Sequence, residues 1–182
     1  MKQNTFLYVL RLALTLLIIT SIMAAALAVV NRITAPVIAN SNDAKTQAAI
    51  AQVLPGGGQE IPFTDKTGLV TGVWASEAGY AVQVIPSGFD GEITMMVGID
   101  IEGKVLGISI ISHTETAGLG AVAAADNAKG QAFRDQFVGM TNNVAVTKDG
   151  GEVDAITGAT ITSRGICAGI NAALACVKEV QP

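Results

Sequence analysis

Residues 154–165 read DAITGATITSRG, a hydroxyl-rich stretch that comes directly before the last apolar segment of the chain. Four hydroxyl side chains surround its Gly–Ala pair: Thr157, Thr160, Thr162 and Ser163. As local structure alone, Asp154 or Thr157 caps a helix, Gly158 permits a tight turn, and Thr162 and Ser163 bond local backbone. The stretch therefore predicts the start of a C-terminal helix over 163–180, and it raises the question whether one hydroxyl is also a chemical attachment point.

The segment after this stretch has the periodicity of a helix with one buried face. Its larger apolar residues are spaced by three and four: Ile166, Ile170, Leu174 and Val177. Cys167 and Cys176 are nine residues apart, which places them about 13 Å apart along a helix axis and on opposite sides. They cannot pair within the helix. With a single histidine and no CxxC, we expect no zinc or iron–sulfur site, so any redox chemistry needs an organic cofactor.

Upstream of the stretch, short runs rich in Val and Ile alternate with turn signals. Strands are predicted over 68–76 and 79–86, and a hairpin over 91–112 with its turn at 102–104. Helices are predicted from Ser41 or Asn42 to Leu54, ended by Pro55 and three glycines, and over 127–139. Residues 142–160 predict a short strand and a Gly–Gly turn. The pattern indicates one α+β domain over 41–182, with antiparallel strands and a C-terminal helix.

The N-terminal part is apolar enough to cross a membrane. Residues 12–30, LALTLLIITSIMAAALAVV, are nineteen consecutive residues without a charge, and a helix of that length spans a hydrocarbon core of about 30 Å. The alternative is a cleaved signal peptide, since AAALA offers small residues at a cleavage site, although the apolar run exceeds the usual signal core of about 7–15 residues. We expect a transmembrane helix over 12–30.

The charges on either side of this helix give its expected orientation. Lys2 and Arg11 favour a cytoplasmic tail over 1–11, although Arg32 and Lys45 on the other side weaken that bias. Residues 31–40 are expected to be a connector, in which Pro36 favours a break or a new helix start. The sequence thus predicts a single-pass protein of the cytoplasmic membrane, with its N-terminus inside and its domain extracytoplasmic.

Composition limits the partners of that domain. Beyond Arg32 the chain holds fifteen acidic and eight basic residues, a net charge of −7. An acidic surface is a poor partner for nucleic acid or anionic lipid. Half of the residues are hydrophobic but only 4% are aromatic, so the core is expected to be aliphatic.

The ordered set in residues 154–160, Asp-x-x-Thr-Gly-Ala-Thr, resembles the flavinylation motif Asp-x-x-Ser/Thr-Gly-Ala-Thr/Ser of the FMN-binding domain family. Similar members are the G subunit of the Rnf electron-transport complex and the C subunit of the sodium-pumping NADH:quinone reductase. The resemblance implies that a flavin transferase moves FMN from FAD onto the Thr160 hydroxyl and leaves a phosphoester link. Asp154, Thr157, Gly158 and Ala159 would form the recognition context.

The residue types suit this chemistry. Phosphoryl transfer needs a reachable hydroxyl nucleophile, and Gly158 and Ala159 place little bulk beside Thr160. An attached phosphate would lie near the start of the last helix, where backbone N–H groups favour anions, and Arg164 is expected to help neutralise it. By chemistry alone Thr162 and Ser163 are rival acceptors, and only the position of Thr160 in the family motif selects it.

A second segment supports the same resemblance. SHTETAGLG, residues 112–120, is similar to the His-x-Glu-Thr-x-Gly-Leu-Gly segment of these subunits, with alanine at 117 where proline is common. The matching positions are His113, Glu115, Thr116, Gly118, Leu119 and Gly120, and the resemblance implies that they contact the flavin. The alternative is an ordinary strand-to-helix connection with a solvated histidine. The GxGxxA within residues 118–123 is not read as a dinucleotide fingerprint, because HTETA separates it from the preceding strand.

The resemblance implies an electron-transfer subunit of a membrane-bound Rnf-type ferredoxin:NAD⁺ oxidoreductase coupled to Na⁺ or H⁺ translocation. Such a subunit relays electrons between cofactors bound to its partners and is not a complete enzyme alone. The expected partners are other subunits of the complex and, during maturation, a flavin transferase. Three alternatives stay open: a C-type quinone-reductase subunit, an anchored binding or sensor module without covalent flavin, and a stand-alone flavoprotein reductase.

Overall fold

The computed structural model describes residues 2–181, except for the side chains of residues 2–6 and 36–41. The chain divides into two compact units, Met1–Ala44 and Lys45–Pro182. The elements in chain order are α1 (Lys2–Val53), β1 (Gln59–Glu60), β2 (Val70–Ser76), β3 (Gly79–Val84), β4 (Ile93–Asp100), β5 (Val105–His113), η1 (Gly120–Ala124), α2 (Ala128–Asp135), η2 (Thr147–Asp149) and α3 (Thr160–Val180).

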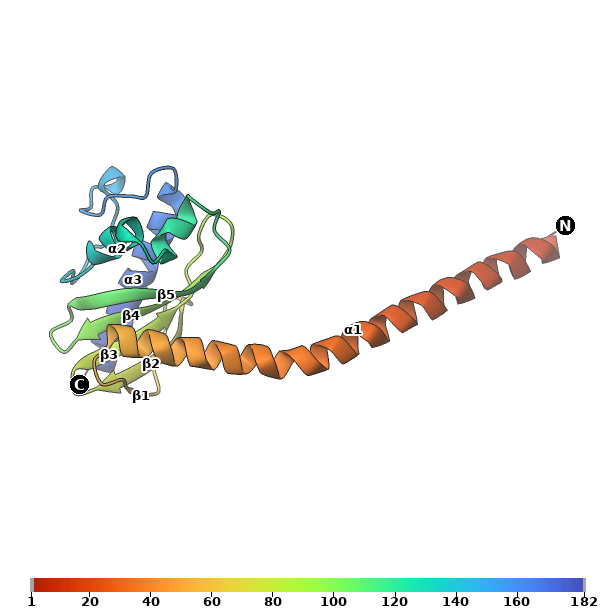
Figure 1. Ribbon diagram of the computed structural model, residues 1–182, viewed down its shortest axis with the longest axis horizontal. Coiled ribbons are helices and arrows are strands. Elements are labelled where there is room, and N and C mark those ends of the chain that lie inside the picture. The colour runs from red at the N-terminus through yellow and green to blue at the C-terminus, as the bar shows by residue number, and fades with distance from the viewer. Residues whose placement is uncertain (1, 182) are drawn as a thin grey trace. The chain divides into compact units, whose positions relative to one another are not determined.

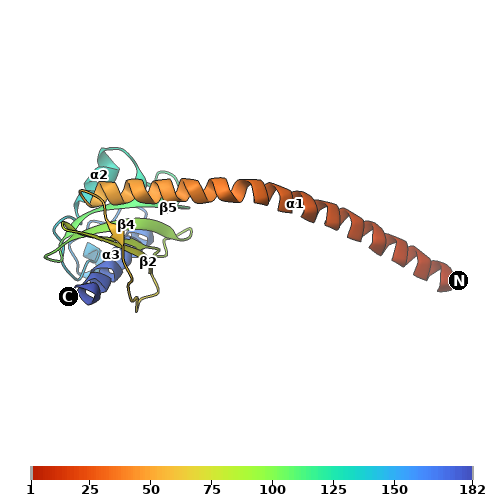
Figure 2. The ribbon, with the colours of Figure 1, turned by 90° about the horizontal axis from the view of Figure 1, so that it is seen from below.

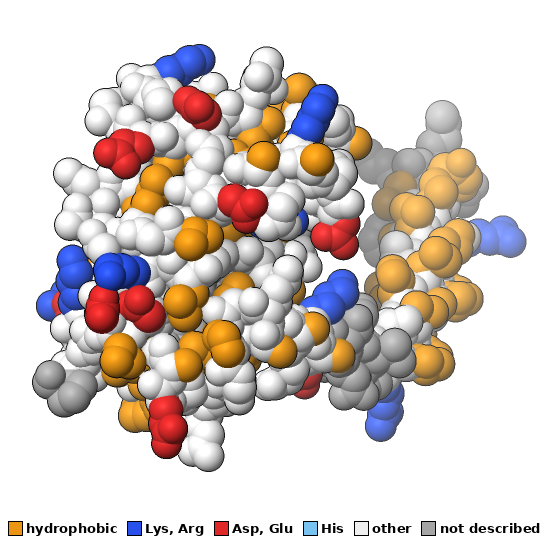
Figure 3. Space-filling model, turned by 60° about the vertical axis from the view of Figure 1, so that its left-hand side comes forward, with side chains coloured by type: hydrophobic (Ala, Val, Ile, Leu, Met, Phe, Trp, Pro, Cys, Tyr) orange, Lys and Arg blue, Asp and Glu red, His pale blue; other side chains and the backbone are white. Residues whose placement is uncertain are grey.

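The first unit is helical and carries the expected apolar segment. Leu7–Ala35 is long and apolar enough to cross a membrane. Its mean hydropathy is 2.5, and no residue of its most apolar stretch is buried. Hydrophobic side chains cover the exposed surface of this helix (Figure 3). The hydroxyls of Thr15, Thr20 and Thr34 donate to carbonyls one turn earlier, so these polar groups are satisfied within the helix, as a hydrocarbon surrounding requires.

The expected break at Pro36 is wrong, because α1 continues as a helix through residues 31–40. A proline removes one intrahelical hydrogen bond, and the helix continues on both sides of that position. The helix expected to start at Ser41 or Asn42 is instead the last part of α1. The proposed cap at Ser41 lies outside the described side chains. The helix ends before Pro55, as predicted.

The second unit is built on a five-stranded sheet in the order β1-β2-β3-β4-β5. All neighbours are antiparallel, so the sheet is a simple meander (Figure 1). Strands β2 to β5 lie where the Val- and Ile-rich runs predicted them, and the hairpin pairs Met95 with Ile110 and Ile99 with Val105. The antiparallel strands and the C-terminal helix of the predicted α+β domain are confirmed.

Both faces of this sheet are covered within the second unit. Met95, Val97 and Ile99 of β4 face the cluster that contains α3, whereas Met96 joins Trp74 and the last turns of α1 in a second cluster. Figure 2 shows the sheet between α3 and the end of α1. Burial on both faces explains why β4 is apolar without alternation.

Helix α3 begins at Thr160, earlier than the predicted start at residue 163. Its N-cap is Ala159, which makes no side-chain cap hydrogen bond, so the predicted capping by Asp154 or Thr157 is wrong. Although α3 is long and apolar, 67% of its most apolar stretch is buried in the second unit. It is therefore the core helix of that unit. Cys167 and Cys176 are free and buried, and they do not pair, as expected.

The strand expected within residues 142–160 is also wrong. This segment forms one isolated bridge, between Val146 and Val153, with η2 between them. The amide side chain of Asn171, on α3, donates to the Val144 carbonyl at 2.8 Å and accepts from its N–H at 3.0 Å. A helix side chain thus satisfies backbone groups that a neighbouring strand would otherwise pair.

Candidate functional site

The two segments singled out in the sequence meet at one cleft of about 370 Å³. It is lined by residues from the β3–β4 loop, the loop after β5, η2 and the start of α3: Phe89, Glu115, Thr116, Leu119, Gly120, Lys148, Gly158, Ala159, Thr160, Ile161 and Thr162. Residues more than 40 positions apart in the chain therefore form a single concave site. Its size falls within the range of about 300–1,000 Å³ that is usual for small-molecule sites.

Thr160 is the hydroxyl that this cleft presents. It is the first residue of α3, it is half-buried, and among the described residues its hydroxyl has no hydrogen-bond partner. The rival hydroxyls are sequestered, with Thr162 1% and Ser163 0% exposed. Thr157 is exposed but does not line the cleft. Burial thus separates Thr160 from neighbours that have the same chemistry.

Ser163 shows why a hydroxyl of this motif can be unavailable. Its Oγ donates to the Ala159 carbonyl and accepts from the Ile156 N–H, both at 3.0 Å. The expected bonding of a hydroxyl to local backbone is confirmed at Ser163. At Thr162 the same expectation is wrong, because that hydroxyl donates to Glu115 Oε2. Ser163 therefore supports the turn that precedes Thr160.

Gly158 shapes the approach to Thr160. Its φ of +79° lies in the left-handed region that favours glycine. A Cβ at this position would lie 3.0 Å from Leu119 Cδ2, from the second segment. The tight turn predicted at Gly158 is confirmed, and it brings the two segments into contact on one side of the cleft.

Glu115 is a buried carboxylate that ties three parts of the site together. Oε1 accepts from the Phe89 N–H at 2.7 Å and the Asp90 N–H at 3.2 Å, and Oε2 accepts from Thr162 Oγ1 at 2.6 Å. Burial acts to raise the pKa of Glu115, but these hydrogen bonds, the one from Thr162 foremost, outweigh it and hold the pKa below its ordinary value. The carboxylate is thus ionised at neutral pH.

Other predicted site residues lie outside the lining of the cleft: Asp154, Thr157, Gly118, His113, Ser163 and Arg164. The guanidinium of Arg164 binds Asp149 through two contacts, at 2.7 and 2.6 Å. His113 lies at the end of β5, opposite Ile93. Its Nδ1 is buried and has no hydrogen-bond partner in the described part of the chain.

Three residues that line the cleft were not identified from the sequence: Phe89, Lys148 and Ile161. Phe89, Leu119 and Ile161 are 69%, 43% and 50% exposed, and we call these three side chains the apolar rim. The sequence carried one weak signal, a phenylalanine in the turn-like segment SGFDG of a chain poor in aromatics. Nothing local marks Lys148, which reaches the cleft only through the fold of residues 142–160.

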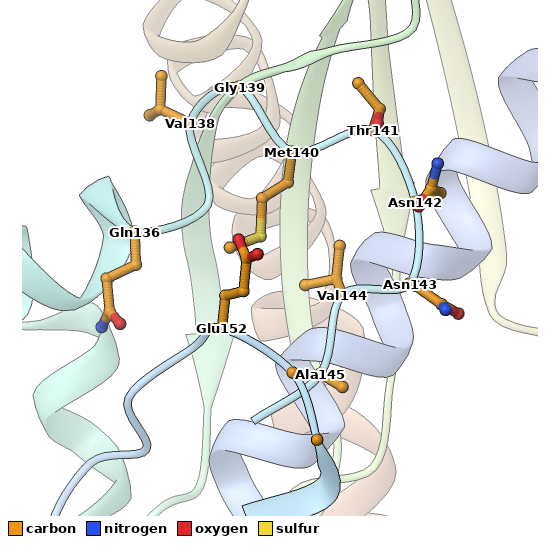
Figure 4. A pocket seen from close by; sticks show the side chains of 12 residues that line it. Gln136, Val138, Gly139, Met140, Thr141, Asn142, Asn143, Val144, Ala145 and Glu152 are labelled. Atoms are coloured by element: carbon orange, nitrogen blue, oxygen red, sulfur yellow. The ribbon is translucent and has the colours of Figure 1, made fainter. Parts of the chain in front are cut away.

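A larger pocket, of about 570 Å³, lies between the loops of residues 136–145 and 150–152. Figure 4 shows that its side chains are both polar, such as Gln136, Asn142 and Glu152, and apolar, such as Val138, Met140 and Val144. It contains none of the predicted site residues and only one ionisable side chain. Elsewhere in the described chain, no group of three or more His, Cys, Asp or Glu residues could hold a metal ion. The smaller cleft is therefore the better candidate.

The residues of that cleft fit a flavin phosphate. Thr160 offers an unpartnered hydroxyl, the first N–H groups of α3 and the ammonium of Lys148 favour an anion, and the apolar rim offers hydrophobic surface to a ring system. Polar backbone of the loop after β5 lies beside the rim. This combination of a few polar groups with apolar walls is typical of cofactor sites.

Comparison with known proteins also indicates an FMN-binding domain. Residues 88–175, which include all the residues that line the cleft, match the FMN-binding domain family. The G subunit of the Na⁺-translocating ferredoxin:NAD⁺ oxidoreductase complex of Acetobacterium woodii is 32% identical, over 90% of this chain and 88% of that protein. The G subunit of the ion-translocating oxidoreductase complex of Stutzerimonas stutzeri is 34% identical, over 89% and 78%. This chain is also similar to the G subunit of the proton-translocating ferredoxin:NAD⁺ oxidoreductase complex of Clostridium ljungdahlii. The two are 38% identical, over 52% of this chain and 51% of that protein.

Proposed function

Because the chain belongs to the FMN-binding domain family that includes the G subunits of ion-translocating oxidoreductase complexes, we propose that it is the electron-transfer subunit of an Rnf-type ferredoxin:NAD⁺ oxidoreductase. It carries FMN covalently on Thr160. Bound FMN supplies one- and two-electron redox chemistry, while the protein holds and orients it. The three relatives named for comparison are all G subunits, which favours this proposal over a C-type quinone-reductase subunit.

One observation carries the proposal: Thr160 alone among the motif hydroxyls is both partly exposed and part of a cleft. In the proposed maturation its Oγ1 forms the bond to phosphorus of the FMN half of FAD. The phosphoanhydride bond breaks, AMP leaves, and the hydroxyl proton passes to a base of the transferase. The burial of Thr162 and Ser163 supports Thr160 as the acceptor on physical grounds, independently of the family register.

Two cations are candidates to neutralise the phosphate. Arg164 was expected from its place in the sequence, and it stays a candidate, although its guanidinium is bound to Asp149. Lys148 lines the cleft itself. We propose Lys148 as the principal cation and Arg164 as a residue that holds η2, which carries Lys148, against the start of α3.

The proposal includes the membrane setting. The apolar segment Leu7–Ala35 anchors the chain, with the N-terminus inside and the FMN domain extracytoplasmic. A covalent bond suits that location, because a dissociating cofactor would be lost by dilution outside the cytoplasm. The partners are the other subunits of the complex, which donate and accept the electrons, and a flavin transferase.

The test is expression of the full chain with and without a flavin transferase, followed by denaturing electrophoresis and intact mass measurement. We expect a flavin-fluorescent band only with the transferase, and its loss in Thr160→Ala. Thr71→Ala, at an exposed threonine of β2 outside the motif, is the matched control for the acceptor. A colourless chain in every case would favour the binding or sensor module. Turnover with small acceptors in the absence of partners would favour a stand-alone reductase.

A further inference from the structure

We propose that Glu115 is a positioning residue for flavin attachment: through Thr162, its carboxylate holds the first turn of α3 so that Thr160 faces the cleft. This inference rests on the proposed function and concerns how the acceptor is presented. It assigns Glu115 a role different from the flavin contact that the family resemblance implied.

The hydrogen bonds at Glu115 come from two separate segments. Thr162 Oγ1 belongs to the first turn of α3, and the Phe89 and Asp90 N–H groups belong to the loop between β3 and β4. An ionised carboxylate can accept several hydrogen bonds at once, and charge-assisted bonds are the stronger ones. One buried side chain, 7% exposed, therefore fixes both segments relative to the loop after β5.

Two glycines confine the carboxylate. A Cβ on Gly88 would collide with Glu115 Oε1, and a Cβ on Gly120 would collide with Oε2 and lie 2.7 Å from Thr162 Oγ1. Backbone without side chains therefore packs against both oxygens. The carboxylate is held by shape as well as by hydrogen bonds, so its position is closely defined.

The geometry at Thr162 links this carboxylate to the acceptor. A threonine near a helix start commonly bonds backbone of its own segment, but here the hydroxyl donates to Glu115 across 47 positions of the chain. Thr162 follows Thr160 by two residues, so fixing Thr162 limits rotation of the helix turn that carries Thr160. Because misplacement of a reacting atom by about 1 Å can cost about 100-fold in rate, this restraint matters for attachment.

The test uses the full chain in detergent, with two isosteric substitutions. Thr162→Val removes the donor and keeps the shape of the side chain, and Thr162→Ser restores the donor. Thr71→Val, at an exposed threonine of β2, is the matched control. The first measurement is the rate of attachment with purified flavin transferase and FAD. The second is amide hydrogen exchange of residues 88–91 and 158–165 in the chain without flavin.

We expect Thr162→Val to slow attachment by about tenfold or more and to speed exchange at Phe89 and Asp90. Thr162→Ser and Thr71→Val should stay within about twofold of the wild type in both measurements. Emission of the single tryptophan, Trp74, which is buried against the end of α1, reports whether each variant is folded.

Two results would overturn the inference. One is a Thr162→Val chain that takes up flavin at the wild-type rate. The other is unchanged exchange of Phe89 and Asp90, which would mean that the carboxylate does not join the two segments. A wild-type chain that takes up no flavin contradicts the proposed function instead, and the exchange measurement then still decides whether Glu115 holds the turn.

Discussion

The Thr162 hydroxyl donates a 2.6 Å hydrogen bond to the buried Glu115 carboxylate, and this bond joins the two sequence motifs into one site. One motif ends β5 and the other begins α3, so neither forms a cleft alone. The same bond occupies a hydroxyl that would otherwise compete with Thr160. The arrangement therefore accounts for both the presence of a cleft and the choice of acceptor within it.

Glu115 gives the stability of the second unit a specific pH dependence. Because its folded pKa lies below the ordinary value of 4.5, the ionised form stabilises the fold above pH 4.5, and this contribution is lost as the pH falls through the lowered pKa. We expect thermal stability, followed by Trp74 emission, to fall less steeply in Glu115→Gln than in the wild type between about pH 5 and about pH 3. Glu77→Gln, at an exposed turn, is the control, and parallel curves for Glu115→Gln and wild type would contradict the prediction.

The left-handed turn at Gly158 is expected to matter for more than stability. Gly158→Ala places a Cβ at a φ of +79° and against Leu119, so it should destabilise the unit by about 1–2 kcal/mol and slow flavin attachment. Gly139→Ala carries the same conformational cost at a φ of +86°, with no neighbour within 4 Å, and it lies away from the cleft. Melting temperature and attachment rate separate the two effects. Equal attachment rates in both variants would mean that the contact with Leu119 does not shape the acceptor.

Lys148 and Arg164 can be compared directly. We expect Lys148→Ala to slow attachment several-fold, because it removes the cation that lines the cleft. Arg164→Ala should have a smaller effect, because that side chain is about half exposed and engaged with Asp149, and such surface pairs contribute about 0–1 kcal/mol. Attachment rates at low and high salt are the measurement. A larger effect of Arg164→Ala would support the role that its sequence position suggested.

The membrane topology is tested with a membrane-impermeant maleimide on intact cells. Cys167 and Cys176 are buried, and burial raises the pKa of both thiols, that of Cys167 to about 11. The native cysteines should therefore stay unlabelled in the folded protein. We expect labelling of Glu102→Cys, at the exposed β4–β5 turn, and not of Gln3→Cys. Labelling of Gln3→Cys alone would place the N-terminus outside and contradict the proposed orientation.

The strands and the C-terminal helix could be predicted from the sequence because their signals are local. Runs of Val and Ile bounded by glycine turns marked β2 to β5, and the spacing of Ile166, Ile170 and Leu174 marked the buried face of α3. The break at Pro36 was wrong because a proline removes only one intrahelical hydrogen bond, and α1 continues on both sides of it. The strand within 142–160 was wrong: the segment forms one isolated bridge, between Val146 and Val153, and the backbone of Val144 pairs with the side chain of Asn171, a distant helix residue.

The cleft could be predicted only in part. The motif identified the residues on either side of Thr160, but the alignment with the family motif did not reveal that Thr162 and Ser163 are buried. Their burial depends on contacts with Glu115 and with the preceding turn. Phe89 and Lys148 were missed because they reach the site from loops without a local pattern. These are long-range placements, which single-sequence periodicity does not encode.

The most direct test of the account is peptide mass spectrometry of the chain purified from membranes of its native host. We predict that the peptide with residues 154–164 carries one FMN, bound through phosphate to the Thr160 oxygen, while Thr157, Thr162 and Ser163 are unmodified. An unmodified peptide, or a flavin located on another hydroxyl, would contradict the central claim.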